Sequence, residues 1–149
     1  MRTLRTILIS IESHPNMKFE IYERLNTGSI SLNAHELRNS IYRGEFNALL
    51  HTLAGLPTFR SLIRSKTTRK RMVDEEAILR FFARRDRLST YRTPLKKFLN
   101  DYMRDMRASN VAALLGTRQV FETTVAHANS IFGSSAFRVF RRGTPWNQR

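Results

Sequence analysis

The sequence predicts a mainly α-helical, multi-helix domain that follows one N-terminal β-strand without an evident partner in the chain. Apolar residues recur every three or four positions over most of the chain, as on one face of a helix. Capping residues and glycines separate these stretches, and an alternating β-branched pattern occurs only near the start. We expect a single domain over 1–149, with a strand and its connection in 1–15, a helical body in 16–142 and a frayed tail in 143–149.

The segment 3–11 is the predicted strand. Ile7, Ile9 and Ile11 alternate within it, as in a strand with one buried face. A lone strand leaves its backbone hydrogen-bonding groups unpaired. We therefore expect this segment to pair with another chain, with a segment absent from this sequence, or with a second copy in a homo-oligomer.

Two helices are expected on either side of a short connection. Asn16 can cap the first, and Gly28 can supply the positive φ at its exit. Asn33 and Glu36 form a capping box at the start of the second helix, where His35 is expected to be an exposed first-turn residue. The apolar stripe of the first helix would consist of Phe19, Tyr22 and Leu25.

Five further helical segments follow, each with a start signal. Acidic residues after Asp74 suit a first turn, because a helix N-terminus carries partial positive charge. The longest segment should run from about Asn110 to Phe132 and end at Gly133. The start signals are Gly44, Pro57, Asp74, Thr93-Pro94 and Asn110, and the stripe of the longest helix is Leu114, Phe121, Val125, Ala128 and Phe132.

Several functional classes find no support in the sequence. The absence of cysteine excludes disulfides, thiolate zinc sites and cysteine nucleophiles. The four histidines have no metal-ligand spacing and no carboxylates clustered around them, and no phosphate-binding glycine loop or serine nucleophile motif occurs. We therefore assign no catalytic residue, metal or cofactor to this chain alone. No apolar run approaches the roughly 20 residues of a membrane helix, so we expect a cytoplasmic protein without a membrane partner.

The net charge of +14 is the strongest global signal. It is concentrated in 56–149, which holds twenty basic and seven acidic residues, against six and five in 1–55. Such a field attracts polyanions, which makes nucleic acid the leading partner, ahead of an anionic membrane or an acidic protein. A basic surface can also serve solubility or balance an acidic partner domain.

The candidate phosphate-binding residues belong to an expected loop, Arg64 to Arg71, and its neighbours. Phosphate contacts from such residues are independent of base sequence and sensitive to salt. The helical members either line a groove with the loop or are scattered as solvated surface. Arg80, Arg84 and Arg87 favour a shared face, because their spacing is four and three. The full set is Arg60, Arg64, Lys66, Arg69, Lys70, Arg71, Arg80, Arg84, Arg87, Lys96 and Lys97.

The connection Asn26-Thr27-Gly28 is a second candidate site. Its backbone N–H groups could hold an anion in a nest-like turn. The alternative is that Gly28 simply ends a helix.

A series of short motifs is spread over most of the chain. They are an aromatic helix leading into Leu25-Asn26-Thr27-Gly28, then Leu32-Asn33, Glu36-Leu37-Arg38-Asn39, Tyr42, Gly44, Phe46-Asn47, Asp74-Glu75, Leu79-Arg80-Phe81-Phe82-Ala83, Phe132-Gly133 and Ala136-Phe137-Arg138. In their identity and order these motifs resemble the N-terminal domain family of GmrSD-type restriction proteins, which is related to ParB and sulfiredoxin-like nuclease folds.

The chain also departs from that family. Ser29 and His35 stand where family members often have a second glycine and a glutamine. The Asp-Gly-Gln-Gln-Arg signature associated with nucleotide hydrolysis is missing, and so is the His-Asn-His-type nuclease domain that often follows. The resemblance therefore implies the C-terminal, helical half of the family domain, as a fragment or the product of a split gene, which agrees with the unpaired strand.

The resemblance implies a role in restricting modified foreign DNA, and hence in phage defence. Asn26, Thr27 and Gly28 would line a nucleotide cleft, braced by Glu36 and Arg38. We expect a DNA-associated helical portion that is not a nuclease by itself. One alternative is half of a hydrolase that takes a nucleoside triphosphate with Mg²⁺ when an upstream chain completes it. The other is a degenerate structural remnant.

Overall fold

The computed structural model describes residues 17–26, 31–63 and 71–137. Within these ranges the chain forms seven α-helices and no strand, which confirms the mainly α fold class. The predicted strand at 3–11 and the expected tail at 143–149 lie outside the described residues. The helices are α1 (Met17–Leu25), α2 (Ala34–Ile41), α3 (Glu45–Ala54), α4 (Pro57–Leu62), α6 (Val73–Arg87), α7 (Leu95–Met106) and α8 (Val111–Phe132), with short 3-10 helices at Leu88–Thr90 and Gly133–Ser135.

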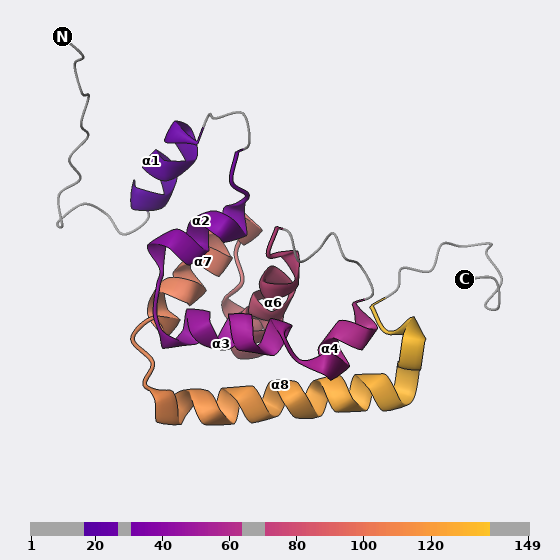
Figure 1. Ribbon diagram of the computed structural model, residues 1–149. Coiled ribbons are helices and arrows are strands. Elements are labelled where there is room, and N and C mark those ends of the chain that lie inside the picture. The colour runs from indigo at the N-terminus through magenta and orange to yellow at the C-terminus, as the bar shows by residue number, and fades with distance from the viewer. Residues whose placement is uncertain (1–16, 27–30, 64–70, 138–149) are drawn as a thin grey trace, which may run out of the picture.

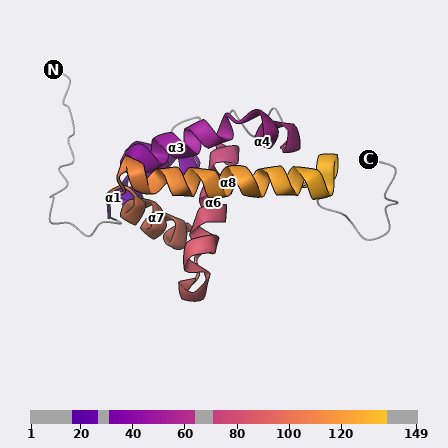
Figure 2. The same cartoon turned by 90° about the horizontal axis from the view of Figure 1, so that it is seen from below.

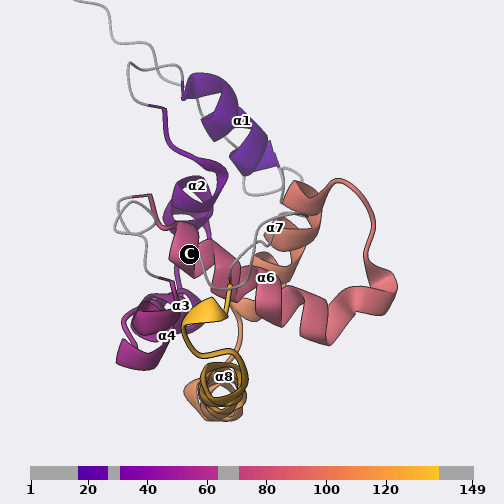
Figure 3. The same cartoon turned by 90° about the vertical axis from the view of Figure 1, so that its right-hand side faces the viewer.

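The helices form layers between α8 on one side of the molecule and α1 on the other (Figures 1 and 3). α3 packs against α6 and α8 and also touches α4 and α7, while α6 contacts α2 and α7. α1 packs on α2. Seen from below, α8 crosses beneath the other helices along the length of the body (Figure 2). No helix among the described residues combines the length and the apolar character that crossing a bilayer requires.

The core lies where α3, α6, α7 and α8 meet, and aromatic rings fill much of it. Leu50 and Ile78 are completely shielded from solvent. Phe46 packs edge-on against Phe82 and Tyr102, with ring centroids 6.1 and 5.8 Å apart. Such edge-to-face pairs stabilise a core beyond the burial of their apolar surface.

Most of the predicted helix starts are confirmed. The side chain of Asn33 accepts hydrogen bonds from the backbone N–H groups of His35 and Glu36, both at 2.9 Å, and the N–H of Asn33 donates to the Glu36 carboxylate at 2.6 Å. This is the predicted capping box. Pro57 stands in the first turn of α4, and Asn110 caps α8 through a side-chain hydrogen bond of 2.8 Å.

The predicted stripe of α1 is only partly buried. Phe19 is 1% exposed, but Tyr22 and Leu25 are 50% and 57% exposed. The prediction is therefore wrong for these last two residues. The reason is that α1 lies at the edge of the molecule, where α2 covers a narrow part of its surface.

The predicted stripe of α8 is buried except near its end. Phe121 and Val125 are buried, whereas Phe132 is 58% exposed, so the prediction is wrong for the last turn. α8 has 22 residues and α3 only 10, so α8 extends beyond the helices that cover it. Gly133 follows with a φ of +49°, which ends the helix as predicted.

Candidate functional site

A single carboxylate in the first turn of α6, that of Glu75, gathers polar side chains from α2 and α3. Nδ1 of His51 lies 2.9 Å from Oε1 of Glu75, and Nδ2 of Asn39 donates a hydrogen bond of 3.1 Å to Oε2. Nε2 of His35 lies 3.6 Å from the same Oε2. Since Glu75 is only 5% exposed, this carboxylate joins three helices from within.

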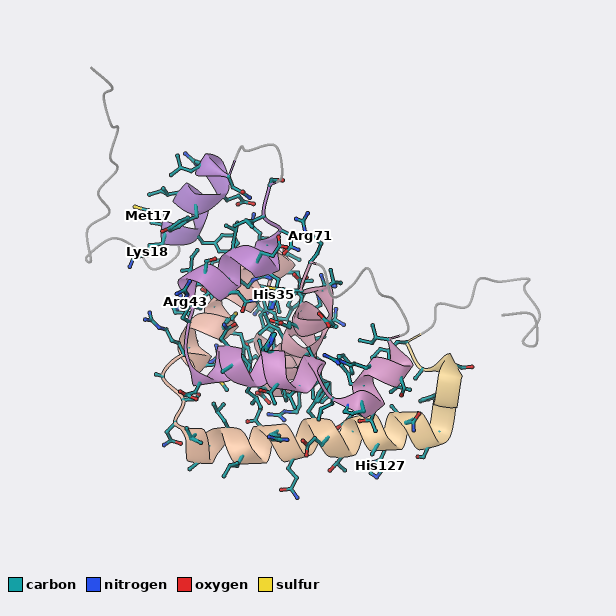
Figure 4. All side chains as sticks on the ribbon, viewed as in Figure 1. Met17, Lys18, His35, Arg43, Arg71 and His127 are labelled. Carbon is teal, nitrogen blue, oxygen red and sulfur yellow. The ribbon has the colours of Figure 1, made fainter. Side chains whose placement is uncertain are left out.

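Two expectations about the histidines are wrong. His35 is completely buried on the inner side of α2 rather than exposed, because the start of α2 packs against α6 (Figure 4). A carboxylate does lie between two histidines, since Glu75 contacts both His35 and His51. Within the described ranges, no three potential metal ligands come together closely enough to hold an ion.

The surroundings of Glu75 keep it ionised despite its burial. Burial alone would raise the pKa of Glu75, because a charge loses its hydration inside the protein. The neighbouring His35 ring and the hydrogen bonds from His51 and Asn39 outweigh this effect and lower the pKa below its ordinary value. The negative charge of Glu75 is therefore part of the folded structure.

A second buried charge, that of Arg38 in α2, contacts side chains of both α6 and α7. Arg38 is 1% exposed, and its Nε donates a 2.7 Å hydrogen bond to Oδ1 of Asn100. Its Nη1 lies 3.2 Å from Oε2 of Glu76, which also pairs with Arg80. Burial lowers the pKa of Arg38, and Glu76 opposes that shift. These contacts join α2 to α6 and α7, so Arg38 braces the helices rather than the predicted cleft at Asn26.

Asn26 is the one described member of the predicted nucleotide cleft, since Thr27 and Gly28 lie outside the described residues. Its side-chain Nδ2 donates to the carbonyl of Leu32 at 2.8 Å, and the N–H of Leu32 donates back to Oδ1 at 2.9 Å. We call this two-way contact the Asn26 clamp. Both polar groups of the amide are thus engaged in closing the connection between α1 and α2.

Arg71 secures the same connection from the start of α6. Its Nη2 donates to the carbonyl of Ser31 at 2.8 Å and to Oε2 of Glu36 at 3.1 Å. Figure 4 shows Arg71 above α6, close to the start of α2. Glu36 therefore combines its capping role with an ion pair, as expected for a bracing residue.

The predicted phosphate-binding residues that the structure describes do not form one continuous face. Arg60 and Arg71 stand on either side of the segment 64–70, which lies outside the described residues together with Arg64, Lys66, Arg69 and Lys70. Arg80, Arg84 and Arg87 belong to α6, and Lys96 and Lys97 belong to α7.

Two of the predicted residues, Arg80 and Arg84, share a pocket of about 530 Å³ on the outer surface of α6. We call it the α6 pocket. Sequence reasoning missed Phe81 in its lining. The signal that could have found this residue is an aromatic side chain interleaved with arginines at helical spacing, which is typical of surfaces that bind single-stranded nucleic acid. The complete lining is Ala77, Arg80, Phe81, Arg84, Arg85 and Leu88.

Arg87 turns away from this pocket and toward α7. Its Nη1 donates a 2.7 Å hydrogen bond to Oδ2 of Asp105, and its guanidinium lies 5.3 Å from the ring centroid of Tyr102. Of the three arginines predicted to share a face, the structure thus brings two together in one pocket.

Lys96 and Lys97 face carboxylates elsewhere, beside a pocket of about 550 Å³ between α1 and α7. Nζ of Lys96 contacts both carboxylate oxygens of Glu23, at 2.7 and 2.6 Å, and lies 5.6 Å from the ring centroid of Phe19. Nζ of Lys97 lies 2.6 Å from Oδ2 of Asp101. Lys96 therefore joins α7 to α1, whereas the pair of Lys97 lies within α7.

Comparisons with known proteins supply no relative for this chain. No family model, curated protein or solved structure matches it. The resemblance to the GmrSD-type family stays a prediction from the sequence, and the functional argument depends on the residues themselves.

Proposed function

We propose that this protein is a DNA-associated helical module that binds nucleic-acid phosphates through the basic residues of α6 and of the segment before it. The observation that supports the proposal best is the α6 pocket, in which Arg80, Arg84 and Arg85 lie together. The net charge of +14 would draw a polyanion toward such a surface.

The ion pairs of the α6 pocket are weak enough for a phosphate to compete with them. Arg80 pairs with Glu76, and Arg85 pairs with the neighbouring Asp86, yet these arginine side chains are 48% and 33% exposed. Exposed pairs of this kind contribute at most about 1 kcal/mol, so a phosphate can compete with the carboxylates. Within the described ranges no carboxylate pairs with Arg84, which leaves its charge available.

The sequence resemblance extends this proposal to a biological role. On that basis, the module would act in the restriction of foreign DNA as a part that is not a nuclease by itself. A partner-completed nucleotide hydrolase is the alternative that the sequence left open. Among the cleft residues that the structure describes, only Asn26 can be judged, and its amide is already bound to Leu32.

The test is the affinity for duplex DNA as a function of salt concentration. If phosphates are contacted, the logarithm of the association constant falls linearly with the logarithm of salt. Arg84→Ala should weaken binding and reduce the slope by about 0.9, the value for one phosphate contact. Arg118→Ala is the matched control, because Arg118 is an exposed arginine on α8 that pairs with Glu122.

Two results would count against the proposal. A salt-independent affinity would rule out phosphate contacts altogether. Equal effects of Arg84→Ala and Arg118→Ala would show that any contact with DNA is not made through α6.

A further inference from the structure

The α6 pocket combines an apolar floor with cationic walls. Ala77 and Phe81 lie four residues apart on one side of α6, and Leu88, which directly follows the helix, lines the same pocket. Arg80, Arg84 and Arg85 supply the rest of the lining beside this apolar strip. A volume of about 530 Å³ is within the range of sites that hold small organic groups.

Phe81 is held in a fixed orientation at this floor. Its ring packs edge-on against Phe82, with the centroids 5.2 Å apart, and against Phe121 of α8 at 5.6 Å. The side chain is nevertheless only half-buried, because it lines the pocket. The protein therefore presents an aromatic ring that is immobilised from behind and accessible from the pocket.

The arginines around this ring are only partly neutralised by nearby carboxylates, so the pocket carries an excess of positive charge. Glu76 is shared between Arg80 and the buried Arg38, so it neutralises Arg80 only in part. Arg85 pairs with Asp86, and its guanidinium also lies 5.2 Å from the ring centroid of Phe82. Arg84 adds a further cation with no carboxylate paired to it among the described residues.

We propose that the α6 pocket binds one unpaired nucleotide of single-stranded nucleic acid, with its base against Phe81 and a flanking phosphate on Arg84. This inference rests on the proposed function, since it specifies the ligand of the same surface. An aromatic ring beside arginines recognises a base face together with a phosphate. In duplex DNA the base faces are covered by stacking, so a duplex contacts only the arginines.

The experiment measures binding of a fluorescently labelled DNA single strand by anisotropy. It compares this strand with an abasic strand of equal length, which has the same phosphates but no bases, and with the corresponding duplex. The wild-type protein should bind the normal strand about tenfold more tightly than the abasic one, as expected for one stacked base.

Two variants distinguish the contribution of the base contact to binding from that of the phosphate contact. Phe81→Leu keeps an apolar side chain against Phe82 and Phe121, and it should lower the affinity for the normal strand to that for the abasic strand. Arg84→Ala should lower the affinity for both strands, whereas the control Arg118→Ala should leave both affinities unchanged. Circular dichroism shows whether each variant folds.

A further measurement tests the same contact without a variant. A strand that carries 2-aminopurine should lose fluorescence when it binds the wild-type protein, because stacking on an aromatic ring quenches this base.

The outcomes distinguish this inference from the proposed function. Equal affinity for normal and abasic strands, or unquenched 2-aminopurine, would overturn the base-binding pocket but leave phosphate binding intact. If poly-glutamate displaces the strand as effectively as unlabelled DNA does, the surface recognises acidic protein, and the inference is wrong. Failure to bind any of the three DNA probes at low salt would overturn the proposed function as well.

Discussion

At the scale of single residues, the central feature is one carboxylate buried among the side chains of three helices. Glu75 contacts Asn39 and His35 of α2 and His51 of α3. A buried charge is costly unless hydrogen bonds replace the water that it has lost. Glu75 therefore stabilises the fold only while it is ionised and its partners are in place.

Replacing this carboxylate by an amide should destabilise the protein. Glu75→Gln keeps the shape of the side chain but removes its charge and adds a donor, so we expect a loss of about 1–3 kcal/mol in the free energy of unfolding, measured by urea denaturation at neutral pH. Glu45→Gln is the control, because it changes an exposed first-turn glutamate of α3. Its loss should not exceed about 1 kcal/mol. Equal losses for the two variants would mean that the helix dipole alone explains the contribution of Glu75 to stability.

Acid should abolish the contribution of Glu75. Its pKa in the folded state lies below the ordinary value of 4.5, so the ionised form is favoured by folding. The stabilisation is complete above that ordinary value and is lost as the pH falls through the lower folded-state pKa. The difference in stability between the wild type and Glu75→Gln should therefore shrink as the pH falls through the ordinary value of 4.5 and below it. A difference that stays constant over this range would contradict this account.

The role of Glu75 could not be read from the sequence. The helix dipole explains acidic residues at 74, 75 and 76 equally well. Which of them is buried depends on how α6 meets α2 and α3, and the partners Asn39 and His51 are 36 and 24 residues away in the chain. The burial of His35 has the same long-range origin.

At the scale of helices, the ends were predictable and the buried faces were less so. Asn33, Pro57 and Asn110 act where their signals predicted, because capping depends on a few neighbouring residues. An apolar stripe shows which side of a helix can be buried. It does not show whether another element covers that side, which is why Tyr22 and Phe132 are exposed.

The cap of α2 should contribute more to the stability of the protein than the cap of α8. Asn33 also donates from Nδ2 to the carbonyl of Arg71 at 2.7 Å, so it joins the start of α2 to the start of α6. We expect Asn33→Ala to cost about 2 kcal/mol and Asn110→Ala about 1 kcal/mol, both measured by chemical denaturation. The second variant serves as the matched control. Equal costs would show that the bond to Arg71 adds nothing to the cap.

At the scale of the whole molecule, one aromatic residue connects α8 to two other helices. The ring of Phe121 lies 5.2 Å from that of Phe59 in α4, and 5.6 and 5.8 Å from those of Phe81 and Phe82 in α6. Loss of this ring would leave a cavity between three helices, because the surrounding side chains cannot close it completely.

Truncation of Phe121 should therefore loosen the whole assembly. We expect Phe121→Ala to lower the free energy of unfolding by about 3–5 kcal/mol in urea denaturation. Val120→Ala, at the adjacent and 41% exposed position, should cost less than about 1 kcal/mol. If the two variants are equally stable, α8 does not depend on this contact.

The distribution of charge over the whole molecule shows a further limit of the sequence. Counting residues predicts a basic surface, but it does not predict which cations are already paired. Lys96 pairs with Glu23 across 73 positions of the chain, and Arg87 pairs with Asp105. Arg84 pairs with no carboxylate of the described residues, and only the arrangement of the helices reveals this.

The Asn26 clamp has a consequence for insertions into the connection between α1 and α2. Because one amide meets both the N–H and the carbonyl of Leu32, Asn26 and Leu32 are held together at the two ends of this connection. The two hydrogen bonds use only atoms at these ends, and lengthening a loop costs little entropy. A reporter peptide for fluorescent labelling can therefore be inserted between these ends while the flanking helices keep their positions.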